Sequence, residues 1–291
     1  MQPRRCLAAQ LYGAALATLL AAAAPAATAA SRPQRVVSLD LCTDQLLLEL
    51  APRQHIAAVT HLAGDASVSA IPDLARGIAI THGAAEDVLR YDPDLILAGP
   101  FGVAATIDLL RRLQRHVVVV PLAQDLDGVR RSVRVVAEAL AEVARGAALL
   151  ADFERRLAAV ASTPDAAAPS AVVYQVGGIV SGPGSLADAV LTAAGFRNLA
   201  RDYRLARNGR LPLELLLAQP PDLLLLASRS GEYRTPAADN LRHPALIRFS
   251  RQHAALELQW QLWLCGTPHV AEAIERLAAW KRRFTGLEPR P

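Results

Sequence analysis

A repeated unit of short helix, Pro-Asp turn and apolar strand constrains the fold of this chain more than any other feature. One copy spans residues 86–97 and the other spans residues 214–225. Each copy begins with Glu and reaches Pro-Asp-Leu after the same spacing, and an apolar run follows. Each also lies at a similar place relative to the first strand of its own half. The repeat therefore predicts two similarly built α/β lobes rather than one continuous sheet.

The rest of the sequence alternates in the way that parallel α/β layers require. Strands are predicted at 35–39, 56–60, 95–98, 117–120, 171–176, 223–226 and 256–260, and helices at 44–50, 86–90, 107–113, 185–194 and 268–284. Residues 127–161 stay helical throughout, and at 1.5 Å per residue residues 143–161 would form one helix of about 28 Å. The predicted fold class is α/β, with two Rossmann-like lobes joined by a long backbone helix and a ligand cleft between them. A helical connection permits a modest rocking of the lobes rather than wide closure.

The N-terminus has the pattern of a secretion signal. Arg4 and Arg5 precede the apolar stretch 11–24, and Ala-Thr-Ala at 27–29 suits a signal-peptidase site. An uncleaved membrane anchor is the alternative, but the apolar run is short for a membrane span. Cleavage and a periplasmic location are therefore predicted. The predicted organisation is a signal peptide at 1–30, an N-terminal lobe at 31–123, linker helices at 124–163 and a C-terminal lobe at 164–291.

Two cysteines remain after cleavage. Cys6 precedes the apolar run and would be removed, which leaves Cys42 and Cys265. An oxidising compartment allows a disulfide between them. Two separate buried thiols fit equally well, and a metal site of two thiolates and a His is a third alternative, although the usual Cys-x-x-Cys spacing is absent.

Charge and motifs exclude several function classes. The net charge is +4, and the arginines are scattered among acidic residues, so no nucleic-acid partner is predicted. The sequence has no Gly-x-Ser-x-Gly, His-Glu-x-x-His or P-loop motif, and the glycines at 177–184 lack dinucleotide-binding spacing. We therefore expect no enzyme activity, no cofactor and no metal site of the protein's own.

Ligand-binding candidates follow from strand order, because ligands of open α/β sheets lie beyond the carboxyl ends of the strands. Aromatic rings there would cover a large planar surface, and arginines would pair with anionic oxygens, so a bulky, partly anionic ligand is predicted. The alternatives are core packing for each aromatic residue and a solvated surface charge for each arginine. The candidates are Thr81, His82, Phe101, Tyr174, Tyr203, Arg204, Arg210, Tyr233 and Trp263.

Glu86 and Glu214 begin the two copies of the repeat, so each is expected at a helix start on the surface of its lobe. Stabilisation by the helix dipole would explain a carboxylate there. We favour a second interpretation, in which the pair docks onto arginines of a two-fold symmetric partner.

Several motifs together resemble the periplasmic binding proteins for ferric siderophores, haem and cobalamin, over essentially all of the mature chain. The motifs are the long central helix, Arg35-Val36-Val37-Ser38-Leu39, His82-Gly83-x-x-Glu86, Pro93-Asp94-Leu95-Ile96, Gly184-Ser185-Leu186, Gly195-Phe196-Arg197-Asn198, and Leu213-Glu214 before Pro221-Asp222-Leu223. The resemblance implies that one Glu on each lobe docks onto the permease dimer of an ABC transporter, and the motif positions map these onto Glu86 and Glu214. It also implies a ligand held between the lobes without turnover.

The resemblance leaves the ligand open. Cobalamin binders that the chain resembles carry Trp at positions matching Thr81, His82 and Arg210, and these are absent. The arginine-rich second lobe favours an anionic iron complex, either a ferric siderophore or a haem-like chelate, with cobalamin or another corrinoid as the alternative. A secreted metal-dependent enzyme on an α/β frame and a signalling sensor are the competing classes. The expected partners are an ABC permease dimer with its ATPase and a small-molecule metal chelate, and the protein itself is expected to be a monomer.

Overall fold

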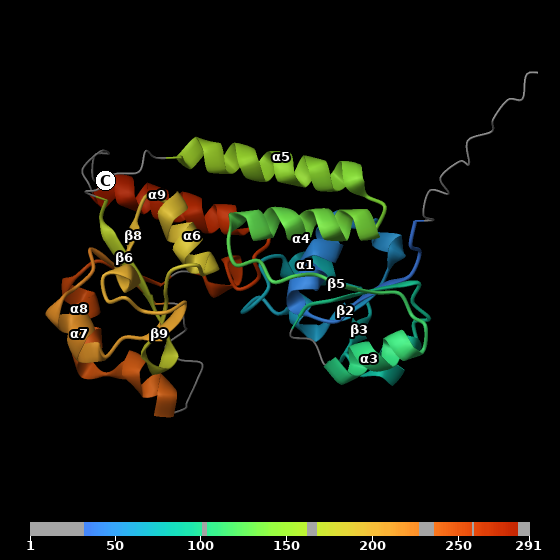
Figure 1. Ribbon diagram of the computed structural model, residues 1–291, viewed down its shortest axis with the longest axis horizontal. Helices are drawn as coiled ribbons and strands as arrows, with labels where there is room; N and C mark the ends of the chain where they lie inside the picture. The colour runs from blue at the N-terminus through green and yellow to red at the C-terminus, as the bar shows by residue number, and fades with distance from the viewer. Residues whose placement is uncertain (1–31, 101–103, 162–167, 227–235, 258, 285–291) are drawn as a thin grey trace, which may run out of the picture. The chain divides into compact units, whose positions relative to one another are not determined.

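Two β-sheets organise the computed structural model, which describes residues 32–100, 104–161, 168–226, 236–257 and 259–284 (Figure 1). The first sheet has the strand order β3-β2-β1-β4-β5, and its neighbouring strands are parallel. The order reverses between β1 and β4, which makes that point the topological switch of the sheet. The elements of this half are β1 (Val36–Ser38), α1 (Leu41–Leu50), β2 (Ile56–Thr60), β3 (Ile80–Thr81), α2 (Ala85–Leu89), β4 (Leu95–Ala98), α3 (Ala104–Arg112) and β5 (Val117–Val119).

The second sheet has the order β11-β10-β6-β7-β9, and β8 pairs with the start of β6. Here β7 runs antiparallel to both β6 and β9, so this half departs from a purely parallel plan. Its elements are β6 (Ser170–Tyr174), β7 (Ile179–Ser181), α6 (Leu186–Ala193), β8 (Arg197–Asn198), β9 (Asn208–Arg210), α7 (Leu213–Ala218), β10 (Leu223–Leu226), α8 (Pro244–Gln252), β11 (Ala255–Glu257) and α9 (Val270–Phe284).

The predicted helical connection is a pair of helices, α4 (Leu126–Ala139) and α5 (Val143–Val160). Helix α5 packs against both α4 and α9 (Figure 1). A Cβ on Gly146 would lie 2.4 Å from the Cβ of Ala137, so glycine is what allows α4 and α5 to approach closely. Arg156 on α5 pairs through two nitrogens with Glu275 on α9, at 2.8 and 2.6 Å. The long helix is thus fixed by packing and by a two-pronged ion pair.

The sequence repeat is also a structural repeat. In the first half, β4 pairs with β1, and the carboxylate of Asp94 accepts from the backbone N–H groups of Gln34 (2.7 Å) and Arg35 (3.0 Å). In the second half, β10 pairs with β6, and Asp222 accepts from the backbone N–H (2.7 Å) and the hydroxyl (2.8 Å) of Ser170. Each Pro-Asp turn therefore fastens the start of the first strand of its half. The α/β prediction with two similarly built halves is confirmed.

Several element boundaries differ from the predictions. The first helix begins at Leu41 rather than at residue 44, because Asp40 caps it. The predicted strand 256–260 ends at Glu257, and Trp260 instead begins a 3₁₀ turn (Trp260–Leu262). Strands β3, β7, β8 and β9 were not predicted, since two or three residues are too few to show a period. Within the described ranges, no helix is both long and apolar enough to span a bilayer.

Candidate ligand-binding and docking sites

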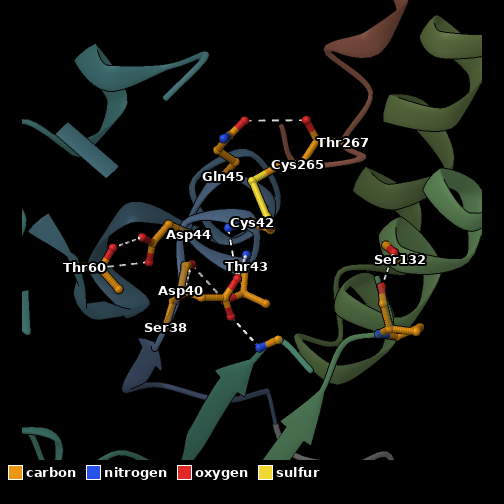
Figure 2. The surroundings of a disulfide bond; sticks show 12 residues. Ser38, Asp40, Cys42, Thr43, Asp44, Gln45, Thr60, Ser132, Cys265 and Thr267 are labelled. Atoms are coloured by element: carbon orange, nitrogen blue, oxygen red, sulfur yellow. Dashed lines mark hydrogen bonds between the residues drawn. A yellow bond between two sulfur atoms is a disulfide. The ribbon is translucent and has the colours of Figure 1, made fainter. Parts of the chain in front are cut away.

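The switch point of the first sheet is occupied by the side chain of Asp40. One carboxylate oxygen accepts from the backbone N–H groups of Cys42 (3.0 Å) and Thr43 (3.2 Å), which caps α1 (Figure 2). The other accepts from the Thr43 hydroxyl at 2.8 Å and from the backbone N–H of Gly99. A Cβ at residue 99 would lie 2.9 Å from that oxygen, so glycine is needed after β4. Asp40 thus links α1 to the segment that leads to Phe101, a candidate that lies outside the described residues.

Thr81 ends β3 and His82 follows it, and a hydrogen-bond network around Asp87 fixes the backbone there. One Asp87 oxygen accepts from the Thr81 hydroxyl (2.9 Å) and from the backbone N–H of His82 (2.7 Å). These bonds lower the pKa of Asp87 to about 2, and the bond from the His82 backbone has the largest effect. The buried Thr81 is therefore used to hold the turn, and the exposed His82 remains at the sheet edge.

Asp44 lies one turn further along α1 and is fully buried. Its carboxylate accepts from the backbone N–H (3.1 Å) and the hydroxyl (2.5 Å) of Thr60, at the end of β2 (Figure 2). Burial raises the pKa of Asp44 to about 7, although the hydrogen bonds oppose that rise. Asp44 therefore fastens α1 to the sheet and does not face a ligand.

Two of the aromatic candidates in the second half, Tyr174 and Trp263, lie in its interior. Tyr174 is 1% exposed in the apolar cluster around β6, and burial raises the pKa of its hydroxyl. Tyr203 packs at the margin of the same cluster and donates to the backbone carbonyl of Leu215 at 3.3 Å. Trp263 is 6% exposed, and its buried Nε1 has no hydrogen-bond partner among the described residues. Tyr233 lies outside the described residues.

The arginine candidates, by contrast, are exposed. Arg210 ends β9, where it pairs with Ile179 at the start of β7, so it lies at the same edge of the sheet as the end of β6. Its guanidinium passes beside the Gly177 and Gly178 turn, since a Cβ on Gly177 would lie 4.0 Å from a terminal nitrogen. Within the described part of the chain, the side chains of Arg210 and Arg204 form no ion pair, which leaves both available for an anion.

A junction between the two halves contains the two cysteines. The structure joins Cys42, in the first turn of α1, to Cys265, just before α9, in a disulfide (Figure 2). Beside it, the hydroxyl of Thr267 donates to the side-chain oxygen of Gln45 at 3.5 Å. The Nε2 atom of His269 lies 3.3 Å from a carboxylate oxygen of Glu49. The sequence left the pairing of the cysteines open and gave no hint of the polar contacts around it, apart from the i, i+4 spacing that places Gln45 and Glu49 on one face of α1.

Glu86 and Glu214 occupy equivalent positions in the two halves. Each lies in the first turn of its helix, α2 or α7, and is exposed. Neither side chain forms a hydrogen bond or ion pair with the described residues. Two unpartnered carboxylates are therefore presented by the two copies of one structural repeat.

Comparison with known proteins establishes the family. The family model described as periplasmic binding protein matches residues 36–251, well over half of the chain. The chain therefore belongs to the periplasmic binding protein family, whose members are binding proteins rather than enzymes.

Individual relatives add detail. A cobalamin-binding protein of Halobacterium salinarum is 27% identical over 233 residues, which cover 79% of this chain and 63% of the relative, so the match spans less than two thirds of that protein. A periplasmic haem-binding protein from Pseudomonas aeruginosa has a TM-score of 0.68 at 23% identity, with 89% and 95% of the two chains covered. The periplasmic haem-binding protein HutB of Vibrio cholerae has a TM-score of 0.69 at 17% identity, with 88% and 99% covered. At these identities the solved structures establish the shared fold.

Proposed function

We propose that this protein is the periplasmic substrate-binding component of an ABC importer. In this role it captures a bulky iron complex, a ferric siderophore or a haem-like chelate, and delivers it to a permease dimer driven by an ATPase. The observation that carries the proposal is the matched pair of Glu86 and Glu214. A permease dimer presents the same surface twice, and a binding protein built from two equivalent halves can offer one carboxylate to each copy.

The ligand part of the proposal rests on Arg204 and Arg210. Both are exposed, and Arg210 stands at the edge of the second sheet beside a glycine turn, where a large ligand can approach the backbone. Guanidinium groups suit carboxylate or catecholate oxygens. In this proposal the metal arrives inside the ligand, and the protein needs no cofactor of its own. The signal peptide at residues 1–30 would direct export and then be cleaved, and the monomer would be the working form.

Cobalamin is the second candidate ligand, and a specific observation favours it. The relative from Halobacterium salinarum is named a cobalamin-binding protein. A corrinoid is as bulky as a haem and also brings its own metal, so the same two-half frame would serve it.

The experiment compares capture with delivery. Purified protein is titrated with a ferric tris-catecholate siderophore, with hemin and with cyanocobalamin, and uptake of the bound chelate is measured in cells that hold the cognate permease. We expect stoichiometric binding without product. We also expect Glu86→Ala with Glu214→Ala to abolish uptake while ligand affinity stays unchanged.

Glu138→Ala is the matched control, since Glu138 is an exposed carboxylate on α4 outside the repeat. It is expected to leave uptake intact. Normal uptake by the double variant would refute the docking role, and turnover of any of the chelates would refute the role of a binding protein.

A further inference from the structure

Two histidines stand side by side at the carboxyl edge of the first sheet. Strands β2 and β3 are parallel, with Thr60 opposite Thr81 at their ends, and the residue that follows each strand is a histidine, His61 or His82. The centroids of the two rings lie 5.8 Å apart with 35° between their planes. Both residues are exposed. Register alone therefore brings two imidazoles together at the edge where α/β sheets bind their ligands.

The backbones that carry these rings are anchored. His82 donates its backbone N–H to Asp87 at 2.7 Å, and the residue before His61 is held by Asp44 through both its backbone N–H and its hydroxyl. A ligand site works best when its supporting backbone is fixed before the ligand arrives. The two histidines meet that condition.

The rings themselves are unengaged. Within the described residues, neither imidazole donates or accepts a hydrogen bond, and the contact of each ring is with the other ring. No third His, Cys, Asp or Glu of the described chain completes a conventional metal-ion cluster with them. A pair of this kind suits a metal whose other positions are already filled by a chelate, because it needs to supply an axial nitrogen and nothing more.

We propose that His61 and His82 form an axial-ligand site for the metal at the centre of a tetrapyrrole. This inference rests on the proposed function and narrows its substrate class. A hexadentate siderophore fills every coordination position of its iron, whereas a porphyrin or corrin ring leaves the axial positions of its metal to other ligands. The histidine pair therefore selects an iron porphyrin or a corrinoid over a ferric siderophore, while Arg210 on the other half meets the anionic groups at the ring margin.

The test uses hemin, aquocobalamin and metal-free protoporphyrin IX with the purified protein and its His61→Ala/His82→Ala variant. Loss of a residue that hydrogen-bonds a metal ligand weakens metal binding by roughly 10–100-fold. Loss of the ligands themselves is therefore expected to lower the affinity at least about tenfold. We expect hemin or aquocobalamin to change its visible spectrum on binding the wild type, and the variant to lose both that change and about tenfold or more in affinity. Metal-free protoporphyrin IX should bind both proteins equally if it binds at all. Added imidazole should restore the spectral change in the variant.

His116→Ala is the matched control. His116 is an exposed histidine of the same sheet that precedes β5, at the opposite end of the strands. Its removal should change neither spectrum nor affinity.

The outcomes separate this inference from the proposed function. An unchanged spectrum and affinity in the double variant would overturn the axial site while leaving the binding protein in place. The same holds if the wild type binds the ferric siderophore alone, or if it binds free Zn²⁺ more tightly than any tetrapyrrole. Failure of the wild type to bind any of the chelates would refute the proposed function itself, and this inference with it.

Discussion

The first α-helices of the two halves, α1 and α6, each bury one carboxyl group. The two groups differ in how the cost of a buried charge is met, by protonation in α1 and by an ion pair in α6. Helix α1 is capped by Asp40 and buries Asp44, and helix α6 is capped by Ser185 and buries Asp188. Asp188 is paired with Arg201 at 2.7 Å. Asp44 has Thr60 as its hydrogen-bond partner, and no cation of the described chain pairs with it.

This difference shows which structural features the two halves share and which they do not. The helix, turn and strand of the repeat recur in both halves, together with the Asp that fastens each first strand, although β7 makes the second sheet mixed. The partners of the buried carboxyl group differ between the halves: Thr60 for Asp44, and Arg201 for Asp188. The first half therefore contains a carboxyl that titrates near neutral pH, whereas the second stabilises its equivalent as an ion pair.

The largest effect is expected where the two halves are joined. Cys42→Ala with Cys265→Ala removes a covalent link between residues separated by 223 positions. Loss of a native disulfide costs about 2–5 kcal/mol, chiefly because the unfolded chain regains freedom. We expect the urea midpoint of unfolding to fall accordingly. Dithiothreitol should lower the wild-type midpoint by a similar amount and leave the variant unaffected, and equal midpoints with and without the bond would contradict the prediction.

A smaller effect is expected from pH, and it sharpens the contrast between Asp44 and Asp188. The pKa of Asp44 is about 7 in the folded protein, against about 3.9 for an unfolded Asp. Between these values the folded state holds the extra proton, so stability falls as pH rises, by up to about 1.4 kcal/mol per pH unit. From pH 5 to pH 8 Asp44 should therefore remove roughly 2–3 kcal/mol, which chemical unfolding at the two pH values would measure.

Asp44→Asn tests the origin of that decline, because the neutral amide keeps the shape and cannot ionise. Its stability should fall much less between pH 5 and pH 8 than that of the wild type. Asp188→Asn is the control: it should weaken the contact with Arg201 and leave the decline in place. An unchanged decline in Asp44→Asn would show that another group causes it.

The smallest effect concerns the repeat itself. Asp94→Ala and Asp222→Ala each deprive the first strand of its half of an acceptor for two hydrogen bonds. The cost should be about 0.5–1.5 kcal/mol for each hydrogen bond lost, because these donors are exposed or part-buried and water can replace the acceptor. If the two turns are equivalent, the losses measured by thermal unfolding should agree closely. A loss confined to one half would mean that the repeat is equivalent in sequence without being equivalent in energy.

The sequence predicted much of the fold and part of the candidate site. Apolar runs such as 95–98 and 223–226 were long enough to identify buried strands, and the capping pattern of Ser185 identified the start of α6. Strands of two or three residues, such as β3, carried no readable period. For the same reason the pairing of His61 with His82 could not be predicted, since it depends on the register between β2 and the short β3.

Local order in the chain determined the helices, the strands and the placement of Glu86 and Glu214 at matching helix starts, because caps, turns and apolar runs act over a few residues. Tertiary structure decided which distant residues meet: the bond between Cys42 and Cys265, and the burial of Asp44 against Thr60. It also decided that Tyr174 and Trp263 lie in the interior while Arg210 remains exposed. These outcomes depend on how whole elements pack, and packing is a property of surfaces that no single segment carries.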